Sequence, residues 1–133
     1  MLKNILAITG KPGLYKMVSN NKNAMIVESV STGKRFPAYT SAQIVALDDI
    51  AIYTESEDMP LREVFKLIAK KTDFGPSINH KEKPELLKEY LKDILPEYDE
   101  DRVYPSDMKK LFQWYNILQE NDLLKVEEEK TED

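Results

Sequence analysis

The sequence predicts an α+β protein in which a small five-stranded sheet, curled and antiparallel or closed as an SH3-like barrel, precedes three helices. Up to about Thr54, short β-prone runs alternate with turn-forming residues at the close spacing of a small sheet or barrel. After Pro60, apolar residues recur at the three- and four-residue spacing of helices. The charge changes at the same place: residues 1–54 contain six basic and three acidic residues, and residues 55–133 contain thirteen and twenty-one.

The composition excludes several classes of protein. The 133 residues include no cysteine and one histidine, His80, and carry a net charge of -5. Without cysteine the chain has no disulfide framework, thiol nucleophile, iron–sulfur cluster or thiolate zinc site. It also lacks the run of about 18 apolar residues that a membrane-spanning helix needs, and its first apolar stretch is too short for a secretory signal. We therefore expect a cytoplasmic protein with no membrane partner.

Five strands are expected, each bounded by turn residues. Pro12 and Gly13 suit the two central positions of a type II turn after the first strand. Pro37 indicates that the fourth strand lies at an edge of the sheet. Between the last two strands, Thr40–Leu47 is expected to form a short helical turn capped by Ser41. The expected strands are Lys3–Ile8, Leu14–Ser19, Ala24–Val30, Arg35–Tyr39 and Asp49–Thr54.

Three helices are expected in the second part. The first begins at Pro60, in the first turn where proline is tolerated, and ends near Lys71. The second opens at Pro84 and stops at Pro96, and the third is capped by Ser106. Their apolar stripes are Leu61, Val64, Phe65 and Ile68; Leu87, Tyr90, Leu91, Ile94 and Leu95; and Met108, Leu111, Phe112, Tyr115 and Leu118.

The chain is expected to divide into a sheet domain over residues 1–56 and a helical domain over residues 57–124. Leu123 and Leu124 are expected to make the last apolar contacts of the helical domain. Residues 125–133 are mostly charged, with too little apolar surface to offset the entropy of ordering, and we expect a disordered acidic tail.

No reactive centre is recognisable in the sequence. The pair Gly33-Lys34 lacks the flanking residues of a phosphate-binding loop. The acidic segment Glu97–Arg102 lacks the glycine that a calcium loop needs, and is expected to be a solvated connection. His80 stands in a polar loop without a nucleophile motif. We therefore expect a protein that is not an enzyme and has no cofactor or metal site.

Basic and aromatic residues instead predict a surface for binding a partner, because arginine and aromatic side chains are strong interface anchors. Trp114 lies beside the apolar stripe of the third helix. It either docks the helices on the sheet or contacts a partner. The candidate residues are Lys11, Lys16, Lys34, Arg35, Arg102, Tyr104, Lys109, Lys110 and Trp114, together with the Gly10–Gly13 turn. The leading hypothesis is a non-enzymatic binding or scaffolding module whose partner is another protein or a second copy.

The alternative hypothesis is binding of nucleic acid by the first domain. Tyr15, Phe36, Tyr39 and Tyr53 stand close in sequence to lysines and an arginine. Small barrels bind single strands by stacking bases on aromatic rings and neutralising phosphates. The small positive charge of this part, in an acidic chain, weakens the hypothesis.

Three parts of the chain carry more specific motifs. They are Gly10–Lys16 (GKPGLYK), Ile50–Thr54 (IAIYT), and Arg102–Lys110 (RVYPSDMKK) with Trp114–Asn116 (WYN). With these motifs the chain resembles a family of uncharacterised bacterial proteins, mainly from Bacteroidetes, over about residues 1–124. The resemblance implies a cytoplasmic protein with an N-terminal domain of unknown function followed by a small helical domain. It implies no activity, cofactor or catalytic residue.

Overall fold

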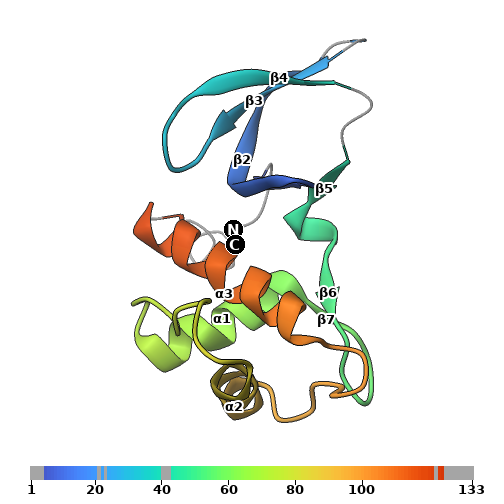
Figure 1. Ribbon diagram of the computed structural model, residues 1–133, viewed down its shortest axis with the longest axis vertical. Helices are drawn as coiled ribbons and strands as arrows, with labels where there is room; N and C mark the ends of the chain where they lie inside the picture. The colour runs from blue at the N-terminus through green and yellow to red at the C-terminus, as the bar shows by residue number, and fades with distance from the viewer. Residues whose placement is uncertain (1–4, 21, 23, 40–42, 122, 125–133) are drawn as a thin grey trace, which may run out of the picture. The chain divides into compact units, whose positions relative to one another are not determined.

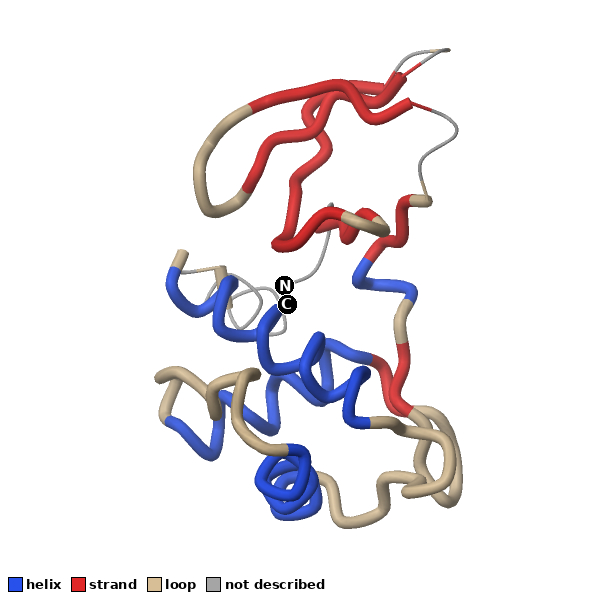
Figure 2. The backbone as a smooth tube through the Cα atoms, viewed as in Figure 1, coloured by secondary structure: helices blue, strands red, loops and turns tan. Residues whose placement is uncertain are grey.

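The chain forms two compact units, residues 2–50 and the residues from Ala51 onward. The computed structural model describes residues 5–20, 22, 24–39, 43–121 and 123–124 (Figure 1). The first unit is a sheet and the second is mainly helical (Figure 2). The expected acidic tail, residues 125–133, lies outside the described residues.

The sheet unit confirms the expected five-stranded antiparallel sheet. Its strands are β1 (Ile5–Ile8), β2 (Lys11–Asn20), β3 (Ala24–Ser29), β4 (Arg35–Tyr39) and β5 (Ile44–Ala46). They are arranged in the order β4-β3-β2-β1-β5, so β4 and β5 form two open edges and the sheet does not close into an SH3-like barrel. The expected edge position of Pro37 is confirmed, because it lies in β4.

One face of the sheet carries an apolar cluster. Strand geometry places alternate residues on the same face, and the cluster follows this rule across the strands. Its buried members are Leu6, Ile8, Tyr15, Val27 and Ala38, and Met25, Phe36, Ile44 and Ala46 pack against them. The rings of Tyr15 and Phe36 meet edge to face, with centroids 5.4 Å apart.

The first hairpin turn lies earlier than expected. Ile8 pairs with Lys11, so Thr9 and Gly10 form the turn, and Gly10 has a φ of +85°. Pro12 and Gly13 lie inside β2, where the pairing register with β1 is irregular. Proline and glycine are tolerated at such irregularities as well as in turns. The pair Pro12-Gly13 therefore does not determine the position of the turn.

The expected fifth strand, Asp49–Thr54, is wrong as a member of this sheet. The sheet's last strand is β5, and Leu6 pairs with Ala46. The helical turn expected over Thr40–Leu47 is therefore wrong in its described part; Ser41, its expected cap, lies outside the described residues. A 3-10 turn, η1 (Leu47–Asp49), follows. The next strand, β6 (Ala51–Ile52), pairs with β7 (Met59–Pro60) in the second unit.

The three expected helices are confirmed as α1 (Leu61–Thr72), α2 (Pro84–Ile94) and α3 (Pro105–Glu120). Ring pairs join them: the centroids of Phe65 and Tyr115 lie 5.8 Å apart, and those of Tyr90 and Phe112 lie 5.2 Å apart. Leu124 is also buried, as expected. No helix in the described ranges is long and apolar enough to cross a membrane.

The start of α3 differs from the expectation. Its N-cap is Tyr104, and Ser106 lies inside the first turn. The side chain of Asp107 accepts a hydrogen bond from the backbone N–H of Tyr104, at 3.0 Å. Proline at the first helical position, Pro105, fixes the start two residues earlier than a cap at Ser106 would.

Candidate interaction surface

Two loops of the helical unit lie side by side although they are far apart in sequence. Thr54 forms an isolated β-bridge with Tyr98. The backbone N–H of Glu55 donates to the carbonyl of Glu97 at 2.8 Å, and the N–H of Asp99 donates to the carbonyl of Tyr53 at 3.0 Å. The residues 53–58 and 97–104 therefore form one continuous piece of surface.

The buried hydroxyl of Thr54 fixes the first of these loops. Its oxygen accepts hydrogen bonds from the backbone N–H groups of Ser56, at 3.3 Å, and Glu57, at 3.0 Å, and the hydroxyl donates to the carbonyl of Glu57. Such side-chain turns order a loop without secondary structure. The backbone of residues 54–57 is consequently held in place.

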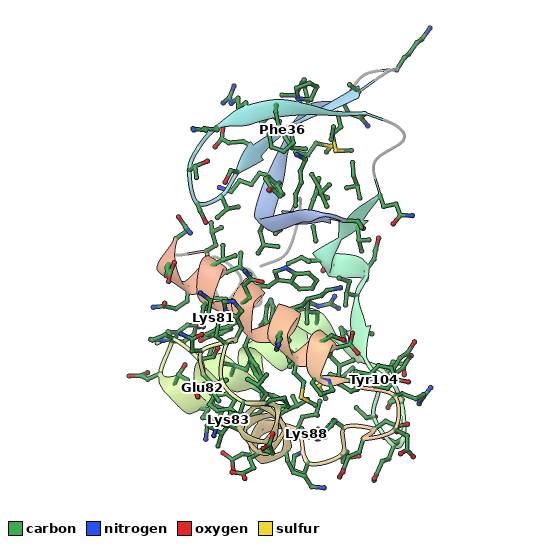
Figure 3. All side chains as sticks on the ribbon, viewed as in Figure 1. Phe36, Lys81, Glu82, Lys83, Lys88 and Tyr104 are labelled. Carbon is green, nitrogen blue, oxygen red and sulfur yellow. The ribbon has the colours of Figure 1, made fainter. Side chains whose placement is uncertain are left out.

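An arginine stacked on a tyrosine stands at the centre of this surface. The guanidinium carbon of Arg102 lies 4.3 Å from the ring centroid of Tyr53. The Nε of Arg102 donates to Oδ2 of Asp99 at 2.8 Å. Tyr53 is 42% exposed, and Tyr104, two residues after Arg102, is 60% exposed. Tyr104 is labelled in Figure 3. We call Tyr53, Arg102 and Tyr104 the tyrosine–arginine patch.

The charges at the patch stabilise each other. The hydrogen bond from Arg102 is the main cause that lowers the pKa of Asp99, and the backbone N–H of Asp101 contributes. The same bond raises the pKa of Arg102, and the nearby carboxylate of Asp58 adds to this effect. Asp99 and Arg102 therefore remain an ion pair at neutral pH.

The five candidates in the helical unit lie along one stretch of chain. Arg102 and Tyr104 belong to the patch. Lys109 and Lys110 are exposed on α3, and Trp114 is half-buried on the same helix. The sequence analysis did not connect Tyr53 or Asp99 with this site. Asp99 and Arg102 are three residues apart in one turn, so their pairing is local in sequence, whereas no local signal relates Tyr53 to Arg102.

The four candidates in the sheet unit do not form one surface. Lys11 lies over the ring of Phe36, 5.0 Å from its centroid, on the face of the apolar cluster. The register places Lys16 and Arg35 on the opposite face. There Nε of Arg35 is 2.8 Å from Oε1 of Glu28. Lys34 lies in the exposed hairpin loop before β4.

This arrangement gives no support to stacking of bases on the sheet. Tyr15 is buried in the apolar cluster, where its ring meets Phe36. Arg35 is paired with a carboxylate on the other face. Of these basic side chains, Lys11 shares the face of the aromatic rings, whereas Lys16 and Arg35 lie on the other face. The side chain of Tyr39 lies outside the described residues.

Neither the acidic segment Glu97–Arg102 nor His80 forms a metal site with other described residues. In the described parts of the chain, no three histidine, aspartate or glutamate side chains lie close enough together to hold a metal ion. The segment's charges form ion pairs instead. Nζ of Lys92 is 2.6 Å from Oε2 of Glu100, and Arg102 is paired with Asp99. His80 is half-exposed at the turn before α2.

Comparison with known proteins shows the family. One family model, described as a domain of unknown function (DUF6852), matches residues 50–118. The chain belongs to this family. A second model, a domain of unknown function (DUF5606), matches residues 2–47. The family resemblance and the order of its two parts are thereby confirmed.

A solved structure supports both the family and the fold. It is a solution NMR structure of a protein from Bacteroides vulgatus, with 48% sequence identity and a TM-score of 0.79. The match covers 92% of this chain and 89% of that chain. The comparison with curated proteins gives no match. Neither domain description assigns a function.

Proposed function

We propose that this family member is a non-enzymatic binding module, and that its helical unit holds a protein partner at the tyrosine–arginine patch. The observation that carries the proposal is the exposed stack of Arg102 on Tyr53, beside the more exposed ring of Tyr104. Tyrosine and arginine are the residues over-represented among those that dominate binding energy at interfaces. Burying these exposed rings against a partner would release their apolar surface from water.

The order of the patch favours binding. Arg102 is held by Asp99 and by the ring of Tyr53, and the loop of Tyr53 is held by the hydroxyl of Thr54. A long side chain that is already immobilised loses little entropy when a partner binds. The patch thus combines exposed anchors with a geometry that needs little rearrangement.

Affinity capture from a Bacteroidetes host would test the proposal. The full chain, a Tyr53→Ala/Tyr104→Ala variant and a Leu86→Ala control would be compared by quantitative mass spectrometry. Leu86 is a suitable control because its side chain on α2 is 42% exposed outside the patch. Loss of a central aromatic anchor typically costs about 2 kcal/mol or more.

We expect one or more proteins to be recovered with the full chain and the control, and at least about tenfold less with the double variant. Equal recovery with all three forms would overturn the assignment of the patch. Each variant would first be shown to be folded by its amide NMR spectrum. A partner that depends on Leu86 rather than on the tyrosines would move the binding site to α2.

A further inference from the structure

The surroundings of the tyrosine–arginine patch are strongly acidic. Because the two loops are paired through their backbones, carboxylates from both surround the same small area. We call these exposed carboxylates the acidic rim. They are Glu55, Glu57, Asp58, Glu97 and Asp101.

The rim is only partly compensated within the described chain: Asp58 lies near enough to act on the charge of Arg102, and Glu55 on that of Lys92. In residues 53–58 and 97–104 the basic side chain is Arg102, and Asp99 occupies its Nε. Lys92 is engaged by Glu100. Among the described residues, none of the five rim carboxylates forms an ion pair, and Glu97 accepts a hydrogen bond from the hydroxyl of Ser56 at 3.4 Å.

The tyrosine rings of the patch are a second, independent indication that this surface binds a cationic group. The face of Tyr53 already stacks a guanidinium group, which shows that this surface suits a cation over a ring. Tyr104 is 60% exposed, and in the described residues no cation lies over its ring. An exposed ring among carboxylates that form no ion pair is the chemistry that binds a second arginine.

We infer that the partner presents an arginine- and lysine-rich segment, which lies across the patch with one arginine side chain stacked on Tyr104 and its neighbours paired with the acidic rim. The inference rests on the proposed function, since it names the partner's chemistry at the same site. Nucleic acid is not this partner, because its phosphates would meet the rim carboxylates as like charges.

A peptide titration tests the inference. The probes are three fluorescent nonapeptides of equal length: one alternating arginine with glycine, one alternating lysine with glycine, and one alternating glutamate with glycine. Binding to the full chain would be measured by anisotropy at low salt and near physiological ionic strength, where the screening length is about 8 Å.

Matched variants separate the site from general charge attraction. The rim variant is Glu55→Gln/Asp58→Asn/Asp101→Asn. The control, Glu82→Gln/Glu85→Gln/Glu89→Gln, removes the same charge from exposed positions at α2. Glu82 and Tyr104 appear at opposite sides of the helical unit in Figure 3. Tyr104→Ala tests the ring alone, and NMR spectra verify folding.

We expect the arginine peptide to bind the full chain and the control alike, and to bind the rim variant and Tyr104→Ala about tenfold more weakly. The lysine peptide should bind more weakly than the arginine peptide, and the glutamate peptide should not bind. Equal binding by the rim variant and the control, or no binding of the arginine peptide at low salt, overturns the inference. So does rim-dependent self-association in light scattering, because the occupant is then a second copy.

The two proposals can fail separately. If the capture experiment loses its partner with the tyrosine variant but the arginine peptide does not bind, the patch is a binding site and its partner is not basic. If the captured proteins do not depend on the tyrosines, the proposed function fails whatever the peptides do.

Discussion

At the scale of single residues, the hydroxyl of Tyr115 joins α3 to the loop after α1. The ring is fully buried and packs on Phe65. Its hydroxyl donates to the carbonyl of Gly75 at 2.9 Å and lies 3.1 Å from Oγ1 of Thr72. Burial is the main cause that raises the pKa of Tyr115, so the hydroxyl stays protonated as a donor.

Replacing Tyr115 by phenylalanine keeps the ring and removes this bond. We expect Tyr115→Phe to lower the free energy of unfolding by about 1–2 kcal/mol, because the Gly75 carbonyl and the Thr72 hydroxyl lose a buried partner. Urea unfolding followed by circular dichroism measures the change. An unchanged midpoint would show that water replaces the hydroxyl without cost.

The ion pair in the patch makes a prediction about pH. Because Asp99 has a lowered pKa in the folded chain, its contribution to stability is present above its ordinary pKa and is lost as pH falls through the lowered value. In Arg102→Ala we expect the pKa of Asp99 to rise toward the ordinary value, while the Asp101 amide keeps part of the shift. NMR titration of the Asp99 carboxyl carbon measures it; an unchanged pKa would mean that Arg102 is not its partner in solution.

At the scale of elements, α3 holds the loop between α1 and α2 through Asn116. Its Oδ1 accepts from the backbone N–H of Ser77 at 2.7 Å and from the Ser77 hydroxyl at 3.0 Å, and its Nδ2 lies 3.3 Å from the carbonyl of Ile78. At the start of this loop, Asp73 and Phe74 both have left-handed φ values, +56° and +64°. Backbone turns close the two ends of the loop, where the N–H of Gly75 donates to the carbonyl of Thr72 and that of Glu82 to the carbonyl of Asn79, and the Asn116 side chain orders its middle.

Removing this anchor should loosen the loop more than the helices. We expect Asn116→Ala to speed amide hydrogen exchange at Ser77 by at least about tenfold, because its donor loses a bond worth roughly 1–3 kcal/mol. Exchange within α2 should change much less. Equal acceleration in both would show that the loop opens only when the whole unit unfolds.

The elements that the sequence predicted best are those with local patterns. The stripe Leu61, Val64, Phe65 and Ile68 lies within one helix, and all four side chains are buried. The strand β5 was missed because three residues are too few to show an alternating pattern. Its identity depends on pairing with β1, which is a non-local contact.

The candidate site was predicted only in part for the same reason. Arg102 and Tyr104 were selected as exposed anchors by residue type, and Asp99 lies three residues before Arg102 in the same turn. Tyr53 was assigned to a strand of the first domain, and its stacking on Arg102 depends on the pairing of two distant loops. Tertiary pairing of this kind leaves no trace in local composition.

At the scale of the whole molecule, each unit buries apolar side chains of its own. The cluster of the sheet unit contains Val27 at its centre, fully buried, and none of its members belongs to the helical unit. The helices bury their own stripes. Each unit therefore has the apolar surface to act as a cooperative region of its own.

A cavity in one core should consequently have a local effect. We expect Val27→Ala to cost about 2 kcal/mol in the sheet unit and to speed amide exchange of its strands by about thirtyfold. Protection in α1, α2 and α3 should stay within about twofold, which is less than 0.5 kcal/mol. Loss of protection across all three helices would show that the chain unfolds as one body. Residue-resolved exchange measured by NMR distinguishes the two results.

Pro37 has a consequence beyond its own strand. The N–H of Ser29 bonds to the carbonyl of Lys34, and hydrogen-bonded pairs alternate along an antiparallel ladder. The pair Ile26 and Pro37 is then a non-bonded one, so the Pro37 nitrogen is turned away from β3. The outer rim of β4 lacks an amide proton at its middle, where an incoming chain would need one. Pro37 thus disfavours pairing of β4 with a strand of another molecule, which is the contact that builds amyloid-like fibres.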